Sequence, residues 1–187
     1  MKTFKKSLLA IAIVAFAVVF SSCDGEKDID DVIKSVTGSA SFTLNGTNHT
    51  MPSAVFVKNN GKLMITSTDT KNYLVLYISA ASTGEYELGL GKNVTDVAGN
   101  IGDISSLLSG DGNYLAYTAN ITDYENATVA LIGSVNFEEM SDSKVKGTFS
   151  ATAIKASQIT NLDVTDIVAL LTGSNLEGEF EAVGKAF

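Results

Sequence analysis

From residue 38 onward, apolar and polar residues alternate along short segments that end in turn residues. Apolar residues take every second position in SASFTL (39–44), and Asn45-Gly46 follows directly. A period of two places the apolar side chains on one face of a β-strand, and Asn-Gly tolerates the positive φ angles of a tight hairpin turn. We therefore predict one hairpin here and a second in AVFVKNNGKLMITST, which turns at residues 59–61.

The same pattern predicts further strands along the chain. YLVLYIS (73–79) is apolar on both faces, which indicates a strand in the centre of a sheet. KVKGTFSATAI (144–154) and LEGEFEAVG (176–184) alternate strictly between small or apolar residues and polar ones. The remaining predicted strands lie at 85–88, 113–119 and 128–137.

Two segments between the strands are less regular. The glycine-rich insert 89–113 contains one candidate helical turn at 103–109, where Asp103 can cap the start and Gly110 the end. A second short helix is predicted near 163–171.

Many short strands separated by turns predict an all-β fold. Because the alternation leaves one face of most strands polar, an antiparallel two-sheet β-sandwich with two short helical inserts is the favoured architecture. A lipocalin-like β-barrel is the alternative. The predicted core of this single domain contains Phe42, Leu74, Leu76, Val145, Phe149 and Phe180.

The N-terminal segment follows a different pattern, an apolar run behind a basic start. Three lysines precede 13 consecutive apolar residues (8–20), fewer than the roughly 20 that a membrane-spanning helix needs. This arrangement is typical of a secretory signal peptide. The run ends at Ser21-Ser22, followed by Cys23, the only cysteine, and by an acidic stretch at 24–31.

This junction resembles a bacterial lipoprotein signal, in which small residues precede a cysteine that becomes the lipidated N-terminus. The resemblance implies a signal peptide at 1–22, acyl chains such as palmitate at Cys23, and an acidic tether over 23–37 before the β-domain at 38–187. Surface lipoproteins of the Bacteroidota often carry such an acidic stretch. The implied location is therefore the outer membrane, with the domain at the cell surface or, alternatively, facing the periplasm.

The β-domain also resembles an uncharacterised lipoprotein family of the Bacteroidota. The residues that carry this likeness are LNGT (44–47), STGEYEL (82–88) and GTFSATA (147–153), in that order along the chain. The resemblance implies an all-β domain of unknown function and brings no catalytic residue with it.

Composition narrows the possible partners. The chain has a net charge of −8, which disfavours nucleic acid as a partner. Its 13 basic residues are all lysine, and Trp is absent. His49 is the only histidine and is interpreted as an edge or half-exposed strand residue; it has no second histidine or free thiol to complete a zinc site or a catalytic dyad. We expect no cofactor and no enzymatic activity.

Candidate binding residues are few. Tyr114, Tyr117 and Tyr124 follow the glycine-rich insert and could form an aromatic platform, although alternation places Tyr114 and Tyr117 on opposite faces of one strand. Asp111 and Asn113 offer oxygen ligands for calcium without a complete calcium-binding loop.

The sequence therefore predicts a lipid-anchored cell-envelope protein that binds or interacts without catalysis. Its partners would be the membrane, through the Cys23 lipid, and envelope proteins or glycans. The alternatives are a glycan-binding accessory lipoprotein, a lipocalin-like carrier of an apolar ligand and a carboxylate-based hydrolase.

Overall fold

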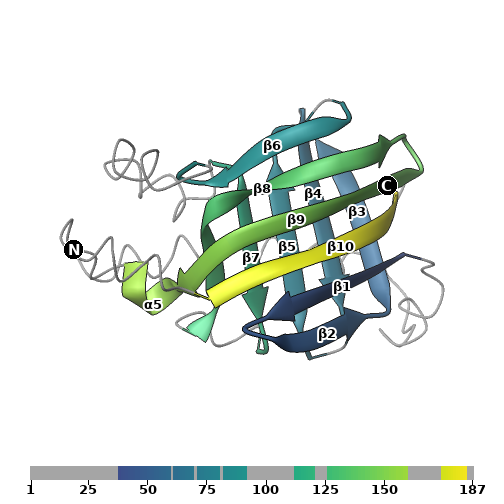
Figure 1. The fold of residues 1–187 in the computed structure, drawn as a ribbon. Coiled ribbons are helices and arrows are strands. Elements are labelled where there is room, and N and C mark those ends of the chain that lie inside the picture. Colours follow the sequence, from purple (N-terminus) through teal and green to yellow (C-terminus); the bar gives the residue numbers. More distant parts are fainter. Residues whose placement is uncertain are drawn as a thin grey trace.

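The computed structural model describes residues 38–59, 61–69, 71–80, 82–91, 112–120, 126–159 and 174–184, and these are almost entirely β-strands (Figure 1). The strands are β1 (Ser39–Leu44), β2 (Thr47–Met51), β3 (Ser53–Asn59), β4 (Lys62–Thr68), β5 (Tyr73–Ile78), β6 (Gly84–Gly89), β7 (Tyr114–Thr118), β8 (Thr128–Met140), β9 (Lys144–Lys155) and β10 (Ser174–Gly184). One short helix, α5 (Ala156–Ile159), follows β9. The helices predicted at 103–109 and 163–171 lie outside the described residues.

Seven strands close into a barrel in the order β10-β3-β4-β5-β7-β8-β9 and back to β10. Strands β1 and β2 extend the wall beyond β10, and β6 extends it beyond β8. In Figure 1 the front strands β8, β9 and β10 cross the back strands β3, β4, β5 and β7. The all-β prediction and its barrel alternative are thus confirmed.

The favoured two-sheet sandwich is wrong, because the hydrogen-bonded ladder passes from one wall to the other at both corners. At one corner β7 pairs with β8 through Ala116 with Val129 and Tyr117 with Thr128. At the other, β10 pairs in parallel with β3 through Val183 and Gly184. These ladders join strands that are distant along the chain, and a period of two does not specify which strands become neighbours.

The predicted first hairpin is present and is shaped by its two turn residues. Asn45 and Gly46 have φ angles of 52° and 78°, the positive values that a two-residue hairpin turn requires. The turn pairs β1 with β2 so that Phe42 faces His49 and Thr43 faces Asn48. Strand β2 has β1 as its partner among the described strands and forms one edge of the wall.

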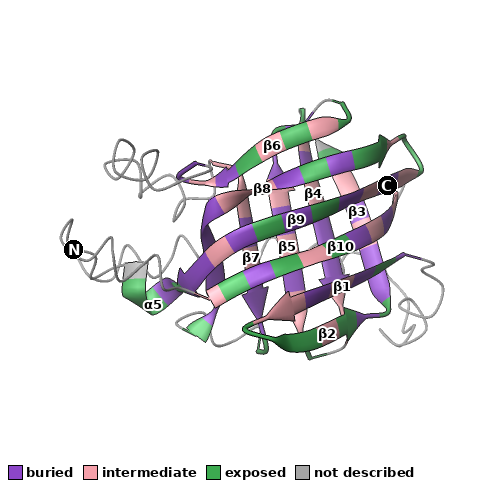
Figure 2. Cartoon of the chain, viewed as in Figure 1, coloured by how far each residue is buried: buried purple, intermediate pink, exposed green. Residues whose placement is uncertain are grey.

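Apolar side chains fill the barrel, and polar ones cover the outside of its front wall. Buried and exposed residues accordingly alternate along β9 and β10 in Figure 2. All six predicted core residues are buried in one cluster. Aromatic rings continue through this cluster from Tyr86 to Phe137, Phe180 and Phe149, with successive centroids 5.7, 5.7 and 6.5 Å apart. Side-chain packing therefore stabilises the barrel without a disulfide.

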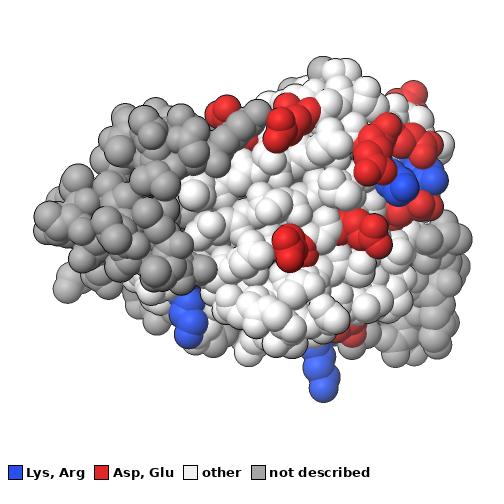
Figure 3. All heavy atoms as spheres, viewed as in Figure 1, with Lys and Arg blue, Asp and Glu red and all other residues white. Residues whose placement is uncertain are grey.

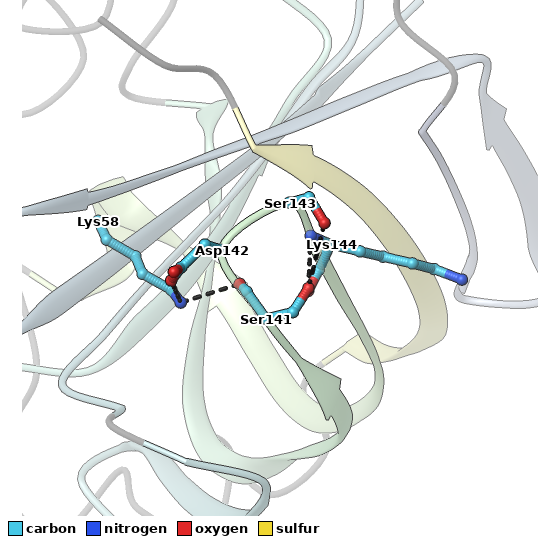
Figure 4. A network of polar contacts seen from close by, with 5 residues as sticks. All are labelled: Lys58, Ser141, Asp142, Ser143 and Lys144. Carbon is cyan, nitrogen blue, oxygen red and sulfur yellow. Dashed lines mark hydrogen bonds and ion pairs between the residues drawn. The ribbon is translucent and has the colours of Figure 1, made fainter.

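The turn between β8 and β9 reinforces the corner where β10 meets β3 (Figure 4). The Lys58 ammonium group donates a hydrogen bond to the Ser141 carbonyl oxygen at 2.9 Å and lies 3.3 Å from Asp142 Oδ1. The backbone N–H of Gly184 donates to the carbonyl of Ser143 at 2.9 Å. The turn thus links the end of β10 to the end of β3.

Candidate functional site

A shallow groove of about 490 Å³ crosses the outer face of β9, β10, β1 and β2. Hydroxyl, amide and carboxylate side chains dominate its lining. The lining residues are Ser41, Phe42, Thr43, Asn48, His49, Thr50, Thr148, Glu177, Gly178 and Glu179. Figure 3 views the molecule from this side: the surface is largely uncharged, carboxylates are scattered over it, and the basic side chains lie toward its periphery.

Strand register places the polar lining residues in two rows across the wall. One row runs from Asn48 through Thr43 to Glu177, since Thr43 pairs with both of the others. The second row contains Thr50, Ser41, Glu179 and Thr148, which are successive cross-strand partners. Both rows point outward because their neighbours along each strand point into the core.

Two hydrogen bonds hold side chains of these rows in position. Thr43 Oγ1 donates to Asn48 Oδ1 at 2.8 Å, which leaves the amide N–H₂ of this lining residue available as a donor. Ser41 Oγ donates to Glu179 Oε1 at 3.3 Å. Glu177 and Glu179 make no ion pair with any residue that the structure describes. The groove therefore presents the Asn48 amide as a donor together with two carboxylates that form no ion pair with a described residue.

An aromatic cluster lies on the inner side of the same hairpin. The His49 ring stacks on Phe42 with centroids 4.8 Å apart, and Tyr117 contacts both rings at 5.2 Å. Because Tyr117 belongs to the opposite wall, this cluster braces the β1–β2 hairpin against β7. The half-exposed edge position predicted for His49 is confirmed, but its stacking depends on strand register and was not predicted.

Polar contacts extend this brace to the turn between β4 and β5. Tyr117 Oη donates to Asn72 Oδ1 at 2.7 Å, and Asn72 Nδ2 donates to Asp69 Oδ2 at 2.7 Å. Burial alone would raise the pKa of Asp69, but hydrogen bonds from the Asn72 backbone and side chain and from the Lys71 backbone hold that pKa below its usual value. Burial and the charge of Asp69 raise the pKa of Tyr117, so its hydroxyl stays a donor.

The predicted tyrosine platform is divided between the two faces of β7. Tyr117 points into the barrel, whereas Tyr114 lies on the outer face of β7 and stacks on Tyr77 with centroids 5.3 Å apart. The Lys62 ammonium group lies 5.0 Å from the centroid of the Tyr77 ring. Burial and the nearby Tyr77 raise the pKa of Tyr114 to about 12.

Several sequence-predicted site residues lie outside the described residues, namely Cys23, Asp111 and Tyr124. Asn113 is described, and its amide joins strand ends: Oδ1 accepts the Ser79 N–H at 2.9 Å and Nδ2 donates to the Glu87 carbonyl at 3.1 Å. Within the described ranges, no group of three or more acidic, histidine or cysteine side chains is placed to hold a metal ion. Nor does any helix in these ranges have the length and apolar character needed to cross a membrane.

Comparison with known proteins gives a family without an assigned activity. The sequence model of the family described as a domain of unknown function (DUF6252) matches residues 49–170. The matched part includes His49 and every strand from β3 to β9, whereas β1 and β10 lie outside it. No curated protein matches the chain.

Proposed function

The chain belongs to the DUF6252 family of domains of unknown function, and from this premise we propose that it is a non-catalytic binding module of the cell envelope that holds saccharide chains in the groove across β9, β10, β1 and β2. The observation that carries this proposal is the chemistry of the groove. Seven of its ten lining residues are Ser, Thr, Asn or Glu.

Such a lining suits a ligand rich in hydroxyl groups. The buried centres of protein–protein interfaces are enriched in aromatic residues and depleted in Ser and Glu, and sites for drug-sized molecules are mostly apolar. A sugar ring instead presents hydroxyls that both donate and accept. The Asn48 amide and the carboxylates of Glu177 and Glu179 complement these two roles directly.

The position of the carboxylates favours binding over hydrolysis. A glycosidase places one carboxyl group on each side of the bond that it cleaves. The side chains of Glu177 and Glu179 instead project from one strand to the same face of the wall, and both are exposed. They are therefore placed to accept hydrogen bonds from a bound sugar rather than to flank a glycosidic bond.

The cell-envelope location rests on the N-terminal sequence. The apolar run 8–20, Ser21-Ser22 and Cys23 favour a lipid anchor at Cys23 in the outer membrane, and the acidic residues after it favour display at the cell surface. A lipid-anchored module there would hold saccharides close to the cell. A periplasm-facing lipoprotein is the alternative location.

The test measures saccharide binding to the full chain purified in detergent. A glycan array would identify ligands, and calorimetry would compare the wild type with the variant Thr43→Ala/Asn48→Ala. We expect affinity to fall about tenfold or more, since each lost hydrogen bond is worth about 1 kcal/mol and 1.4 kcal/mol is tenfold. The matched control Ser134→Ala/Thr152→Ala changes two outer-face polar residues beyond the groove and should leave affinity unchanged.

The opposite results would contradict the proposal. Absence of saccharide binding, or equal losses in both double variants, would remove the groove as the site. Hydrolysis of a bound polysaccharide that stops in Glu177→Gln or Glu179→Gln would show an enzyme instead.

A further inference from the structure

Building on the proposed saccharide site, we propose that the groove prefers saccharides that carry amino groups over neutral ones, and neutral ones over acidic ones. The basis is the charge of the lining. Among the described residues that line it, Glu177 and Glu179 are the only carboxylates and there is no lysine.

Other carboxylates on the same wall are neutralised by lysines. Lys144 Nζ lies 3.4 Å from Glu139 Oε2 and 3.3 Å from Glu181 Oε2. Lys146 Nζ lies 3.2 Å from Glu138 Oε2. These pairs occupy Lys144 and Lys146 of β9, and Glu177 and Glu179 form no ion pair with a described residue, so their negative charge remains available to a ligand.

The two carboxylates are also spaced to act separately. They are two residues apart on β10, which places their Cα atoms about 7 Å apart along the strand. Each belongs to a different polar row, next to Thr43 in one and Ser41 in the other. A sugar seated on either row would therefore meet hydroxyl groups and one carboxylate, and an ammonium substituent there would pair with that carboxylate.

The electrostatic contribution of each contact is modest because the groove is open to solvent. Each exposed ion pair strengthens binding by about fivefold at most and weakens as salt is added. Two such pairs give a preference of about tenfold at low ionic strength. The hydroxyl rows supply the remaining affinity, which is independent of ligand charge.

Three oligosaccharide probes of equal length test this order. Chitosan oligosaccharide carries free amino groups, chitin oligosaccharide has the same backbone with each amine acetylated, and oligogalacturonate is acidic. For the full chain, we expect chitosan to bind about tenfold more tightly than chitin, and oligogalacturonate most weakly. Added salt should reduce the difference between chitosan and chitin.

A charge-matched pair of variants separates the groove from the net charge of the molecule. Glu177→Gln/Glu179→Gln keeps an oxygen acceptor at each position but removes both charges, and it should abolish the preference, so that chitosan and chitin bind with equal affinity. Glu85→Gln/Glu87→Gln removes two exposed charges from β6, outside the groove, and should keep the preference. If chitin and chitosan bind the wild type equally, or if both variants lose the preference, the charge inference is wrong while saccharide binding survives. If no saccharide binds at all, the proposed function fails.

Discussion

Phenylalanine and glycine face each other across neighbouring strands on the inner side of the front wall. Gly147 of β9 lies between Phe137 of β8 and Phe180 of β10. A Cβ atom at residue 147 would collide with the Asn136 carbonyl oxygen and would lie 2.9 Å from Phe180 Cζ. The missing side chain thus provides the space in which the rings meet edge to face.

The variant Gly147→Ala tests this packing. Because a backbone carbonyl cannot move aside as a flexible side chain can, we expect the free energy of unfolding to fall by about 1–3 kcal/mol. Urea denaturation measures the change. Ser150→Ala on the exposed face of the same strand should stay within about 0.5 kcal/mol of the wild type. An unchanged midpoint for Gly147→Ala would show that the wall relaxes freely around an added methyl group.

Tyr114 provides a second prediction for a single residue. Its pKa of about 12 lies above the model-peptide value of 10.0, so the folded state disfavours the tyrosinate form. Unfolding at a pH between these two values releases a proton, and stability should therefore fall as pH rises from about 10 to 12. Spectrophotometric titration should show tyrosine absorbance that titrates late, and the part due to Tyr114 should be absent in Tyr114→Phe, whereas the part due to Tyr117 remains. An unchanged late absorbance in that variant would contradict the assignment.

The sequence predicts which face of a strand each residue occupies better than it predicts which strands lie next to each other. The alternation identified Phe42 and Phe149 as inward-facing and Glu177 and Glu179 as outward-facing, and the structure confirms both pairs. It could not predict the groove. The two polar rows of the groove form because β10 pairs with β1, and about 130 residues separate these strands in the sequence.

Strand β10 is the element that organises the architecture. It pairs with β9 along most of its length, and on its other side it pairs first with β1 and then, at Val183 and Gly184, with β3. The first part of the strand builds the groove and the last part closes the barrel. A change of partner along one side of a strand does not alter the alternation of apolar and polar residues in that strand. The alternation alone therefore favoured a sandwich over the barrel.

The corner between β10 and β3 should be a weak point of the barrel, because two residue pairs form its ladder. Lys58→Met keeps the apolar stem of the side chain but removes its contacts with Ser141 and Asp142. We expect a loss of up to about 1 kcal/mol, since the pair is exposed. Hydrogen exchange should become faster at the ends of β3 and β10 first.

Lys62→Met is the matched control for this element. It removes an ammonium group that lies over the Tyr77 ring at the start of β4, where Lys62 pairs with Asn59 but makes no polar contact with the β8–β9 turn among the described residues. Faster exchange at β3 and β10 in the Lys58 variant alone would support the role of the β8–β9 turn. Equal effects in both variants would mean that the turn does not reinforce the corner.

At the scale of the whole molecule, the groove lies close to the point where the described chain begins. Gly38 immediately precedes β1, a groove strand, and its carbonyl accepts the Ala54 N–H at 3.2 Å. The 14 residues between Cys23 and Gly38 can span at most about 50 Å when fully extended. A lipid at Cys23 would therefore keep Gly38, immediately before the groove strand β1, within about 50 Å of the membrane surface, which brings the proposed saccharide site close to the cell.

The last prediction concerns that anchor. A single buried acyl chain binds a membrane only marginally, whereas several chains, each contributing about 0.8 kcal/mol per buried CH₂, anchor it stably. We therefore expect the wild type, expressed in a bacterium of the Bacteroidota, to incorporate labelled fatty acid and to fractionate with the outer membrane, and Cys23→Ala to do neither. Protease added to intact cells should remove the wild-type domain. Replacement of Asp24, Glu26, Asp28, Asp30 and Asp31 by Ala should protect it from protease while the lipid label remains. A wild-type chain without label would contradict anchoring, and unchanged protease sensitivity after the replacements would contradict only the role of the acidic stretch in export.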